Sequence, residues 1–173
     1  FDVTITDDED GTFTYASAEY CVSGSDPTPT ITGTTGGTFS STTGLSINSS
    51  TGEIDLSAST AGTYTVSYLT SSNTCAATGT FDVTITDDED GTFTYAATEY
   101  CKSGSNPTPT VTGTTGGTFS STAGLSINAS TGEIDIAAST AGTYTVSYLT
   151  SSNLCAVTGT FDVTITDDED GTF

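Results

Sequence analysis

Residues 63–68 read TYTVSY and residues 81–86 read FDVTIT, and both stretches alternate large apolar side chains with small polar or acidic ones. A period of two is typical of a β-strand with one face buried and the other in water. Shorter stretches that fit the same interpretation lie at 12–15, 30–32, 38–40, 45–47 and 54–56. Turn-forming residues separate these stretches, and none of them shows helical periodicity. The sequence therefore predicts an all-β protein.

The strands belong to a unit that repeats every 80 residues. Phe1, Phe81 and Phe161 each open the segment FDVTITDDEDGTF, and 69 of 80 positions are identical between residues 1–80 and 81–160. This period is longer than the roughly 20–50 residues of a solenoid repeat, and it suits a small domain with a core of its own. About seven short strands in each unit, roughly 8–12 residues apart, predict tandem immunoglobulin-like β-sandwich domains.

The repeat predicts how the chain is organised. Residues 1–10 carry the last strand of a preceding repeat and an acidic linker, 11–90 and 91–170 are two repeats with their linkers, and 171–173 begin another. We therefore expect the sequence to be part of a longer array. The side chains expected to point inward in the first repeat are Phe13, Tyr15, Ile31, Phe39, Leu45, Ile47, Ile54, Leu56, Tyr64, Val66, Tyr68, Phe81, Val83 and Ile85.

The charge of the chain excludes several classes of partner. Its formal net charge is −21, from 22 acidic residues and one basic residue, Lys102. Nucleic acids and anionic membrane surfaces are bound through basic side chains, so we expect neither as a partner. No apolar run approaches the roughly 20 residues of a membrane-spanning helix, so we expect no membrane insertion.

The residue inventory also argues against an enzyme. Without histidine, the chain cannot form a Ser-His-Asp or Cys-His catalytic set. With one basic residue, it has no clamp for a transferring phosphoryl group. A glycosidase with paired carboxylates is formally possible, but the acidic clusters recur in every unit, as expected of a scaffold. We predict a protein that is not an enzyme and has no organic cofactor.

Each repeat contains two cysteines, Cys21 with Cys75 in the first and Cys101 with Cys155 in the second. Isolated cysteines at this spacing match no zinc pattern, and paired cysteines in a small β-domain indicate a disulfide. We predict one disulfide within each domain, buried thiols being the alternative. A simple strand order places Cys21 and Cys75 at opposite ends of the sandwich, so the Cys21 segment has to bend or change sheets to reach Cys75. A disulfide implies an oxidising compartment, hence secretion.

The segment Asp7-Asp8-Glu9-Asp10-Gly11 recurs at 87–91 and 167–171, between the last strand of one unit and the first strand of the next. It is predicted to be the linker between domains. Calcium binds about six to eight oxygen ligands, and such a linker can supply several, so we expect Ca²⁺ to stiffen the joint. The alternative is a solvated, self-repelling hinge without a metal.

The predicted calcium ligands are Asp7, Asp8, Glu9, Asp10, Asp87, Asp88, Glu89, Asp90, Asp167, Asp168 and Asp170. Loops could add the auxiliary ligands Asp26, Glu53, Asn73, Asn106, Glu133 and Asn153. Asp26 of the first repeat is replaced by Asn106 in the second, which keeps an oxygen and loses the charge. This replacement suits a peripheral ligand or a turn residue, and we favour the turn.

Five segments of the repeat, residues 20–29, 36–41, 44–48, 50–56 and 61–66, together resemble the Ig-like repeats of giant cell-surface adhesins of the Bacteroidota. The resemblance spans the whole repeat. It implies export through the type IX secretion system and display as long filaments on the cell surface, where some members serve attachment or gliding. It does not identify a ligand.

Three functions are compatible with these features. The first is a tension-bearing stalk of an extracellular filament, in which neighbouring repeats of the same chain are the main partners. The second is a self-assembling fibre or sheath, with lateral or strand-exchange contacts to other copies, in which another chain completes the open edge of Phe1–Ile5. The account we favour for this strand is that it belongs to the preceding repeat. The third is a weak multivalent module that binds glycans on a surface. The alternation of the tyrosines points them inward, which leaves no aromatic platform for a sugar.

Overall fold

The computed structural model describes residues 1–71, 74–152 and 154–168, and these residues form an all-β structure, which confirms the predicted class. The chain divides into two compact units, Phe1–Asp88 and Glu89–Phe173. Among the described residues there is no helix long and apolar enough to cross a membrane.

The described residues of each unit include eight strands. Those of the first unit are β1 (Phe13–Thr14), β2 (Glu19–Cys21), β3 (Thr30–Ile31), β4 (Thr38–Ser41), β5 (Ser46–Ile47), β6 (Ile54–Asp55), β7 (Gly62–Leu69) and β8 (Thr78–Thr86). Those of the second unit are β9 (Phe93–Thr94), β10 (Glu99–Cys101), β11 (Thr110–Val111), β12 (Thr118–Ser121), β13 (Ser126–Ile127), β14 (Ile134–Asp135), β15 (Gly142–Leu149) and β16 (Thr158–Thr166).

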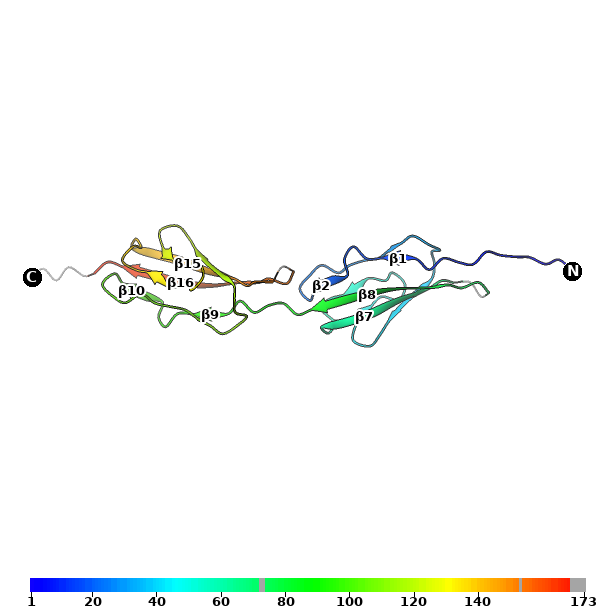
Figure 1. Cartoon of the computed structure of the whole chain (residues 1–173), viewed down its shortest axis with the longest axis horizontal. Coiled ribbons are helices and arrows are strands. Elements are labelled where there is room, and N and C mark those ends of the chain that lie inside the picture. Colours follow the sequence, from blue (N-terminus) through cyan, green and yellow to red (C-terminus); the bar gives the residue numbers. More distant parts are fainter. Residues whose placement is uncertain (72–73, 153, 169–173) are drawn as a thin grey trace, which may run out of the picture. The chain divides into compact units, whose positions relative to one another are not determined.

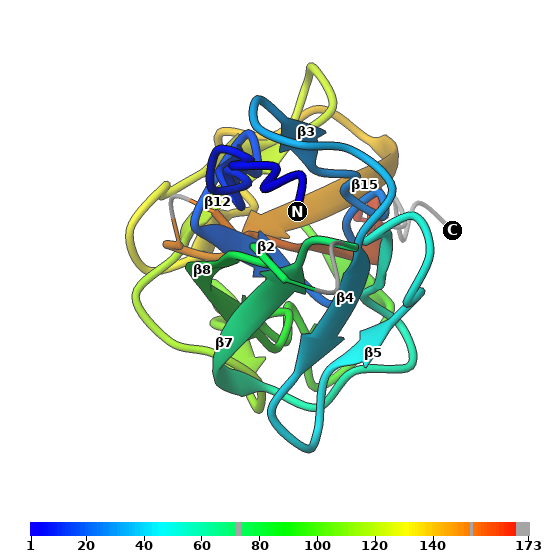
Figure 2. The ribbon, with the colours of Figure 1, turned by 90° about the vertical axis from the view of Figure 1, so that its right-hand side faces the viewer.

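The main sheet of the first unit has the order β2-β8-β7-β4. The long strands β7 and β8 are antiparallel, with Tyr64 opposite Val83, and they run side by side in Figure 1. In Figure 2, β4 lies next to β7, and β5 lies on the other side of β4. Two antiparallel pairs, β1-β3 and β5-β6, complete the unit. The second unit repeats this arrangement with the order β10-β16-β15-β12.

The core of the first unit consists of the predicted inward side chains. Ten of them are buried, namely Phe13, Tyr15, Phe39, Ile54, Leu56, Tyr64, Val66, Tyr68, Val83 and Ile85. Ile31, Leu45, Ile47 and Phe81 are partly buried against this cluster. The aromatic rings pack edge to face or tilted, with 5.3 Å between the centroids of Phe13 and Phe39 and 4.5 Å between those of Phe39 and Tyr68. Side chains from the main sheet and from the two smaller pairs meet in one core, as in the predicted sandwich.

One strand was not predicted. The sequence pattern predicts about seven strands and none at Glu19–Cys21, because three residues are too few for a periodic pattern. In the structure these residues form β2, which pairs in parallel with the end of β8 and places Cys21 opposite Thr86. Residues near the start of the repeat therefore pair with β8, the last strand of the repeat.

A close approach of two glycines fixes the other end of β8. A Cβ atom added to Gly79 would lie 1.9 Å from the carbonyl oxygen of Gly11, and one added to Gly11 would lie 2.5 Å from the nitrogen of Gly79. A side chain at either position would therefore collide with backbone. The chain enters the first repeat in direct contact with the start of β8.

Candidate functional site: the acidic linker and the two ends of each repeat

The N-terminal end of the first repeat, where Gly11 contacts the start of β8, holds the acidic segment by its backbone. The N–H of Glu9 donates to the carbonyl oxygen of Cys75 at 3.0 Å, and the N–H of Asp10 donates to Thr34 Oγ1 at 3.1 Å. The N–H of Thr34 donates back to the carbonyl oxygen of Asp10 at 2.6 Å. Residues 9 and 10 are therefore fixed to the repeat that follows them.

The second repeat holds its acidic segment in the same way. The N–H of Glu89 donates to the carbonyl oxygen of Cys155 at 3.1 Å, and the N–H of Asp90 donates to Thr114 Oγ1 at 3.1 Å. The carboxylate of Glu89 also accepts a hydrogen bond from the N–H of Ser152 at 2.9 Å. No sequence pattern marks Thr114 or Ser152 as linker contacts, because both lie in loops far from the linker along the chain.

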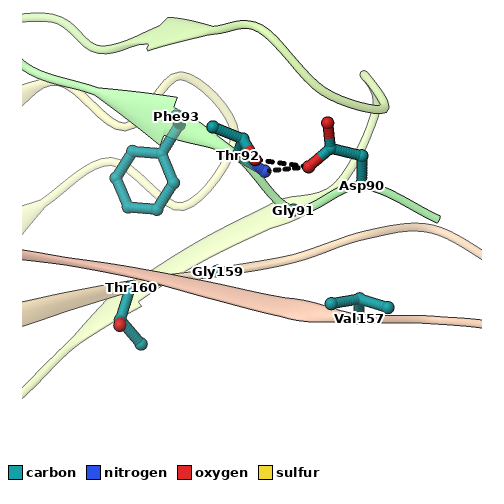
Figure 3. A pocket seen from close by; sticks show the side chains of 7 residues that line it. All are labelled: Asp90, Gly91, Thr92, Phe93, Val157, Gly159 and Thr160. Atoms are coloured by element: carbon teal, nitrogen blue, oxygen red, sulfur yellow. Dashed lines mark hydrogen bonds between the residues drawn. The ribbon is translucent and has the colours of Figure 1, made fainter. Parts of the chain in front are cut away.

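The last acidic residue before each repeat caps the turn into the first strand. Asp90 Oδ1 accepts hydrogen bonds from the N–H of Thr92 at 2.9 Å and from its hydroxyl (Figure 3). These hydrogen bonds favour the ionised carboxylate and lower the pKa of Asp90, although the residue is exposed. Asp10 makes the same contacts with Thr12, which lower its pKa as well. Both residues therefore serve as turn caps.

A hollow lies beside Asp90 in the second repeat. It is bordered by Asp90, Phe93, Val157 and Gly159, among others, and the carboxylate of Asp90 points to Thr92 in Figure 3. The Asp90 carboxylate already accepts two hydrogen bonds from Thr92, and the other lining residues are apolar or carry hydroxyl groups.

The C-terminal end of the first repeat, where β8 finishes, holds the acidic segment that follows. The N–H of Val22 donates to the carbonyl oxygen of Thr86 at 3.0 Å, and the hydroxyl of Ser23 donates to Asp88 Oδ1 at 2.8 Å. Since Val22 and Ser23 directly follow Cys21, the unexpected strand β2 is what brings them to this end.

The second repeat makes the same kind of contact at its C-terminal end. The N–H of Ser103 donates to Asp168 Oδ1 at 3.0 Å, and Lys102 Nζ lies 3.1 Å from Asp167 Oδ1. The hydrogen bonds from Ser103, helped by the charge of Lys102, lower the pKa of the exposed Asp168. The basic residue of the chain thus partly offsets the acidic segment at this position.

Adjacent residues of the linker make their hydrogen bonds with different repeats. Asp88 is held by the first repeat through Ser23, and the next residue, Glu89, is held by the second repeat through Ser152 and Cys155. The linker therefore contains no stretch of several residues without contacts.

The predicted calcium ligands are distributed along these contacts. Asp7, Asp8, Asp10, Asp87, Asp90, Asp167 and Asp168 are exposed, whereas Glu9, Asp88 and Glu89 are half-buried. Asp170, Asn73 and Asn153 lie outside the described residues. In the described part of the chain, no set of three acidic side chains alone brings its ligand oxygens within 4.8 Å of one another.

Two of the predicted auxiliary ligands, Asp26 and Glu53, border a common hollow with Asp55 in the first repeat. Asn106, Glu133 and Asp135 border the equivalent hollow in the second repeat. Asp26 Oδ1 accepts a hydrogen bond from the N–H of Leu56 at 2.9 Å.

Asn106 reproduces this contact with its amide oxygen, which accepts from the N–H of Ile136 at 3.2 Å. Asp and Asn therefore make the same hydrogen bond at this position, and no negative charge is needed for it. This contact agrees with the turn role favoured from the sequence.

The cysteines differ from the prediction. Cys21 and Cys155 are disulfide-bonded, whereas Cys75 and Cys101 are present as thiols. Cys75 Sγ lies 3.1 Å from Thr6 Oγ1 at the N-terminal end of the first repeat, and Cys101 lies opposite Thr166 at the C-terminal end of the second. The predicted disulfide within each domain is therefore wrong, because the two cysteines of a repeat lie at opposite ends of its last strand.

No family model and no curated protein matches the sequence. Solved structures that resemble the chain include a SusE-like surface-located polysaccharide-binding protein from the Bacteroides thetaiotaomicron heparin utilisation locus (TM-score 0.40, 16% identity, 90% of this chain and 34% of that chain covered). They also include mouse cadherin-23 EC22-24 (TM-score 0.37, 14% identity, 93% of this chain and 66% of that chain covered). A third is human protocadherin-24 EC1-2 (TM-score 0.39, 10% identity, 90% of this chain and 98% of that chain covered). The chain thus spans about a third of the first of these proteins and just under two thirds of the second.

Proposed function

We propose that this chain is a non-enzymatic segment of an extracellular surface filament, in which each repeat is part of a tension-bearing stalk. The resemblance of the repeat to giant Bacteroidota adhesins supports display on the cell surface after export by the type IX system. The observation that carries the proposal is the parallel pairing of β2 with β8. β8 leads to the C-terminal end of the first repeat, and β2 follows shortly after the residues that enter at the N-terminal end.

Tension along the chain loads this pair in shear. It pulls Gly11, which lies against the start of β8, and Thr86, which ends β8, in opposite directions. Two parallel strands pulled in this way slide along each other, so their evenly spaced hydrogen bonds resist together and do not open one at a time. The pairing is extended at both ends by hydrogen bonds from Thr84 N–H to the oxygen of Ala18, at 2.8 Å, and from Val22 N–H to that of Thr86, at 3.0 Å.

The linker contacts support the same function. Because successive residues of the linker are held by successive repeats, tension passes from one repeat to the next through little slack chain. A Gly/Ser-type linker would instead behave as a flexible coil. Short anchored linkers suit a stalk that holds a distal part of the protein away from the cell.

Force spectroscopy on the whole chain, under reducing conditions, tests the stalk. Val22→Pro removes the N–H that donates to Thr86, so one of the two unfolding events should occur at a lower force than in the parent protein. Val22→Lys is the matched control, because the second repeat carries Lys102 at this position and donates the same hydrogen bond. Equal unfolding forces for all three proteins would show that the β2–β8 pair does not resist tension.

Calcium at the linker is a second element of this proposal. The four consecutive carboxylates at 87–90 and the net charge of −21 favour a cation there. Asp88, Glu89 and Asp90 already accept hydrogen bonds, so an ion would use their remaining lone pairs or draw them away from Ser23 and Ser152.

Calorimetric titration with calcium, combined with small-angle scattering, tests the metal. The control carries Asn in place of Asp87, Asp88 and Asp90. Binding that changes the scattering, and that is lost in the control, supports a calcium-stiffened joint. An absence of heat, with identical scattering in calcium and in chelator, leaves the hydrogen bonds alone to hold the linker.

A self-assembling fibre is the alternative function. It would require the segment that forms part of β8 at residues 81–85 in one chain to pair with the sheet edge of another copy. Light scattering across a concentration series separates the two functions, since a stalk segment stays monomeric and a fibre protein assembles. A glycan-binding role has less support, because Tyr15, Tyr64 and Tyr68 are buried and donate their hydroxyls to backbone carbonyls.

A further inference from the structure

The peptide bond between Asp10 and Gly11 joins two residues that form a chemically labile pair in neutral water. Glycine has no side chain to shield its backbone nitrogen, so this nitrogen can attack the side-chain carboxyl carbon of the preceding aspartate. The turn nevertheless needs both residues. A Cβ atom on Gly11 would lie 2.5 Å from the nitrogen of Gly79, which requires glycine there. Asp10 supplies the carboxylate that accepts from the N–H of Thr12.

The attack changes the main chain in two steps. The nitrogen of Gly11 bonds to the side-chain carboxyl carbon of Asp10, and a carboxyl oxygen leaves as water with the proton of the carboxyl group and that of the nitrogen. The product is a cyclic succinimide. Water then opens the ring, and when it adds to the main-chain carbonyl carbon of Asp10, the chain continues through the side chain as isoaspartate. The water lost in the first step is regained in the second, but the main chain has gained a carbon atom.

Hydrogen bonds hold the carboxyl group of Asp10 away from this reaction. Its Oδ1 accepts from the N–H of Thr12 at 2.9 Å and also from the hydroxyl of Thr12. Figure 3 shows the equivalent carboxylate of Asp90 turned toward Thr92, the residue beyond Gly91. Ring closure draws the carboxyl carbon onto the glycine nitrogen, so it has to break the contacts of the carboxylate with the threonine.

The peptide plane between Asp10 and Gly11 is also fixed on two sides. A Cβ atom on Gly33 would lie 2.1 Å from the carbonyl oxygen of Asp10, and one on Gly79 would lie 1.9 Å from that of Gly11. The N–H of Thr34 donates to the carbonyl oxygen of Asp10 at 2.6 Å. Ring closure turns the Cα–C bond of Asp10 and with it this plane. The folded repeat leaves little room for that rotation.

We propose that the cap by Thr12 and the loop at residues 33–34 protect the Asp10–Gly11 bond from isoaspartate formation as long as the first repeat is folded. The protection follows from contacts within the repeat, so it does not depend on the proposed stalk function.

The second repeat protects its own bond between Asp90 and Gly91 by the same contacts. Thr92 caps the carboxylate, and the N–H of Thr114 donates to the carbonyl oxygen of Asp90 at 2.6 Å. A Cβ atom on Gly113 would lie 2.1 Å from that oxygen. Two independent copies of the labile pair are therefore held in the same way.

The protection matters because isoaspartate would destroy the anchor of the linker. In an isoaspartyl residue at position 10, the carbonyl that now accepts from Thr34 becomes part of a free carboxylate outside the main chain. The added carbon atom also displaces the chain relative to Gly11, which has no free space beside Gly79. A folded repeat thus keeps its linker chemically intact, whereas an unfolded repeat exposes the bond to this reaction.

Incubation of the whole chain at neutral pH, below its unfolding temperature, tests the protection against a parallel sample unfolded in urea and reductant. Cleavage after glutamate releases peptides 10–19 and 90–99, which differ at their residues 17–18 and 97–98, so each repeat is followed separately. Chromatography separates the isoaspartyl from the aspartyl form of each peptide. We expect isoaspartate to form at least about tenfold more slowly in the folded chain, because ring closure has to break hydrogen bonds to a charged group. Equal rates in the two samples would overturn the proposal.

Variants assign the effect to the cap. Thr12→Val keeps the shape of the side chain and removes the hydroxyl, so isoaspartate should form several-fold faster at residue 10 and at an unchanged rate at residue 90 of the same molecule. Thr92→Val should do the reverse. Tyr15→Phe destabilises the first repeat without touching the cap, and the rate at residue 10 should stay close to that of the parent. A parental rate in Thr12→Val, or an equal rise in Tyr15→Phe, would refute a protective cap.

Discussion

Replacement of Gly79 by alanine should loosen the N-terminal end of the first repeat. The new Cβ would lie 1.9 Å from the carbonyl oxygen and 2.7 Å from the carbonyl carbon of Gly11, both backbone atoms. Gly11 must therefore retreat by more than 1 Å, and it carries Glu9 and Asp10 with it. The hydrogen bonds from their N–H groups to Cys75 and Thr34 should lengthen as a result.

Two effects of opposite sign decide how far Gly79→Ala changes the free energy of unfolding. A glycine-to-alanine change that the backbone tolerates stabilises a protein by about 0.4–1 kcal/mol, because it restricts the unfolded chain. Overpacking against a fixed neighbour costs about 1–3 kcal/mol. The clash is with backbone, which cannot rotate away as a side chain would, so we expect a net loss of about 1–2 kcal/mol in the free energy of unfolding.

Urea unfolding, with backbone hydrogen exchange followed at Glu9 and Asp10, measures this effect. Exchange at Glu89 and Asp90 should stay unchanged, since the second repeat makes its own equivalent contact between Gly91 and Gly159. Gly159→Ala should instead change the exchange at Glu89 and Asp90 and leave that at Glu9 and Asp10 unchanged. Thr80→Ala, at an exposed position beside Gly79, should leave the exchange in both repeats unaffected. A Gly79→Ala protein as stable as the parent, with unchanged exchange at Glu9, would refute the close contact.

Three further results are expected. Tyr15→Phe should destabilise the first repeat by about 1–3 kcal/mol in urea unfolding, because it leaves the buried carbonyl of Gly52 without the hydroxyl that donates to it at 2.5 Å. The hydrogen bonds from Thr92 lower the pKa of Asp90, so the ionised Asp90 should stabilise the second repeat above about pH 4 and lose this effect as the pH falls further. Asp90→Asn should therefore flatten the acidic part of a profile of stability against pH. Asp26→Asn should change the unfolding midpoint little, whereas Asp26→Ala should lower it, since only the alanine loses the acceptor; equal midpoints would contradict the turn role.

The sequence determined the features that depend on residues close together in the chain. Alternation along β7 and β8 predicted strands with one buried face, and the predicted inward side chains form the core, because the period of a strand is local and burial follows it. The net charge and the missing histidine argued against a nucleic-acid partner and against most catalytic chemistry, and this argument needs only the composition and no fold.

Only the tertiary structure decided which residues meet at the ends of a repeat. Glu19–Cys21 is too short to show a period, and its parallel pairing with β8 depends on contacts more than sixty residues away. That pairing places Cys21 opposite Thr86 and away from Cys75, which contradicts the predicted disulfide between Cys21 and Cys75. The linker contacts of Ser23 and Ser152 arise in the same way. Hydrogen-bond register between distant strands leaves no pattern in the sequence, because it is fixed by the packing of the whole sandwich.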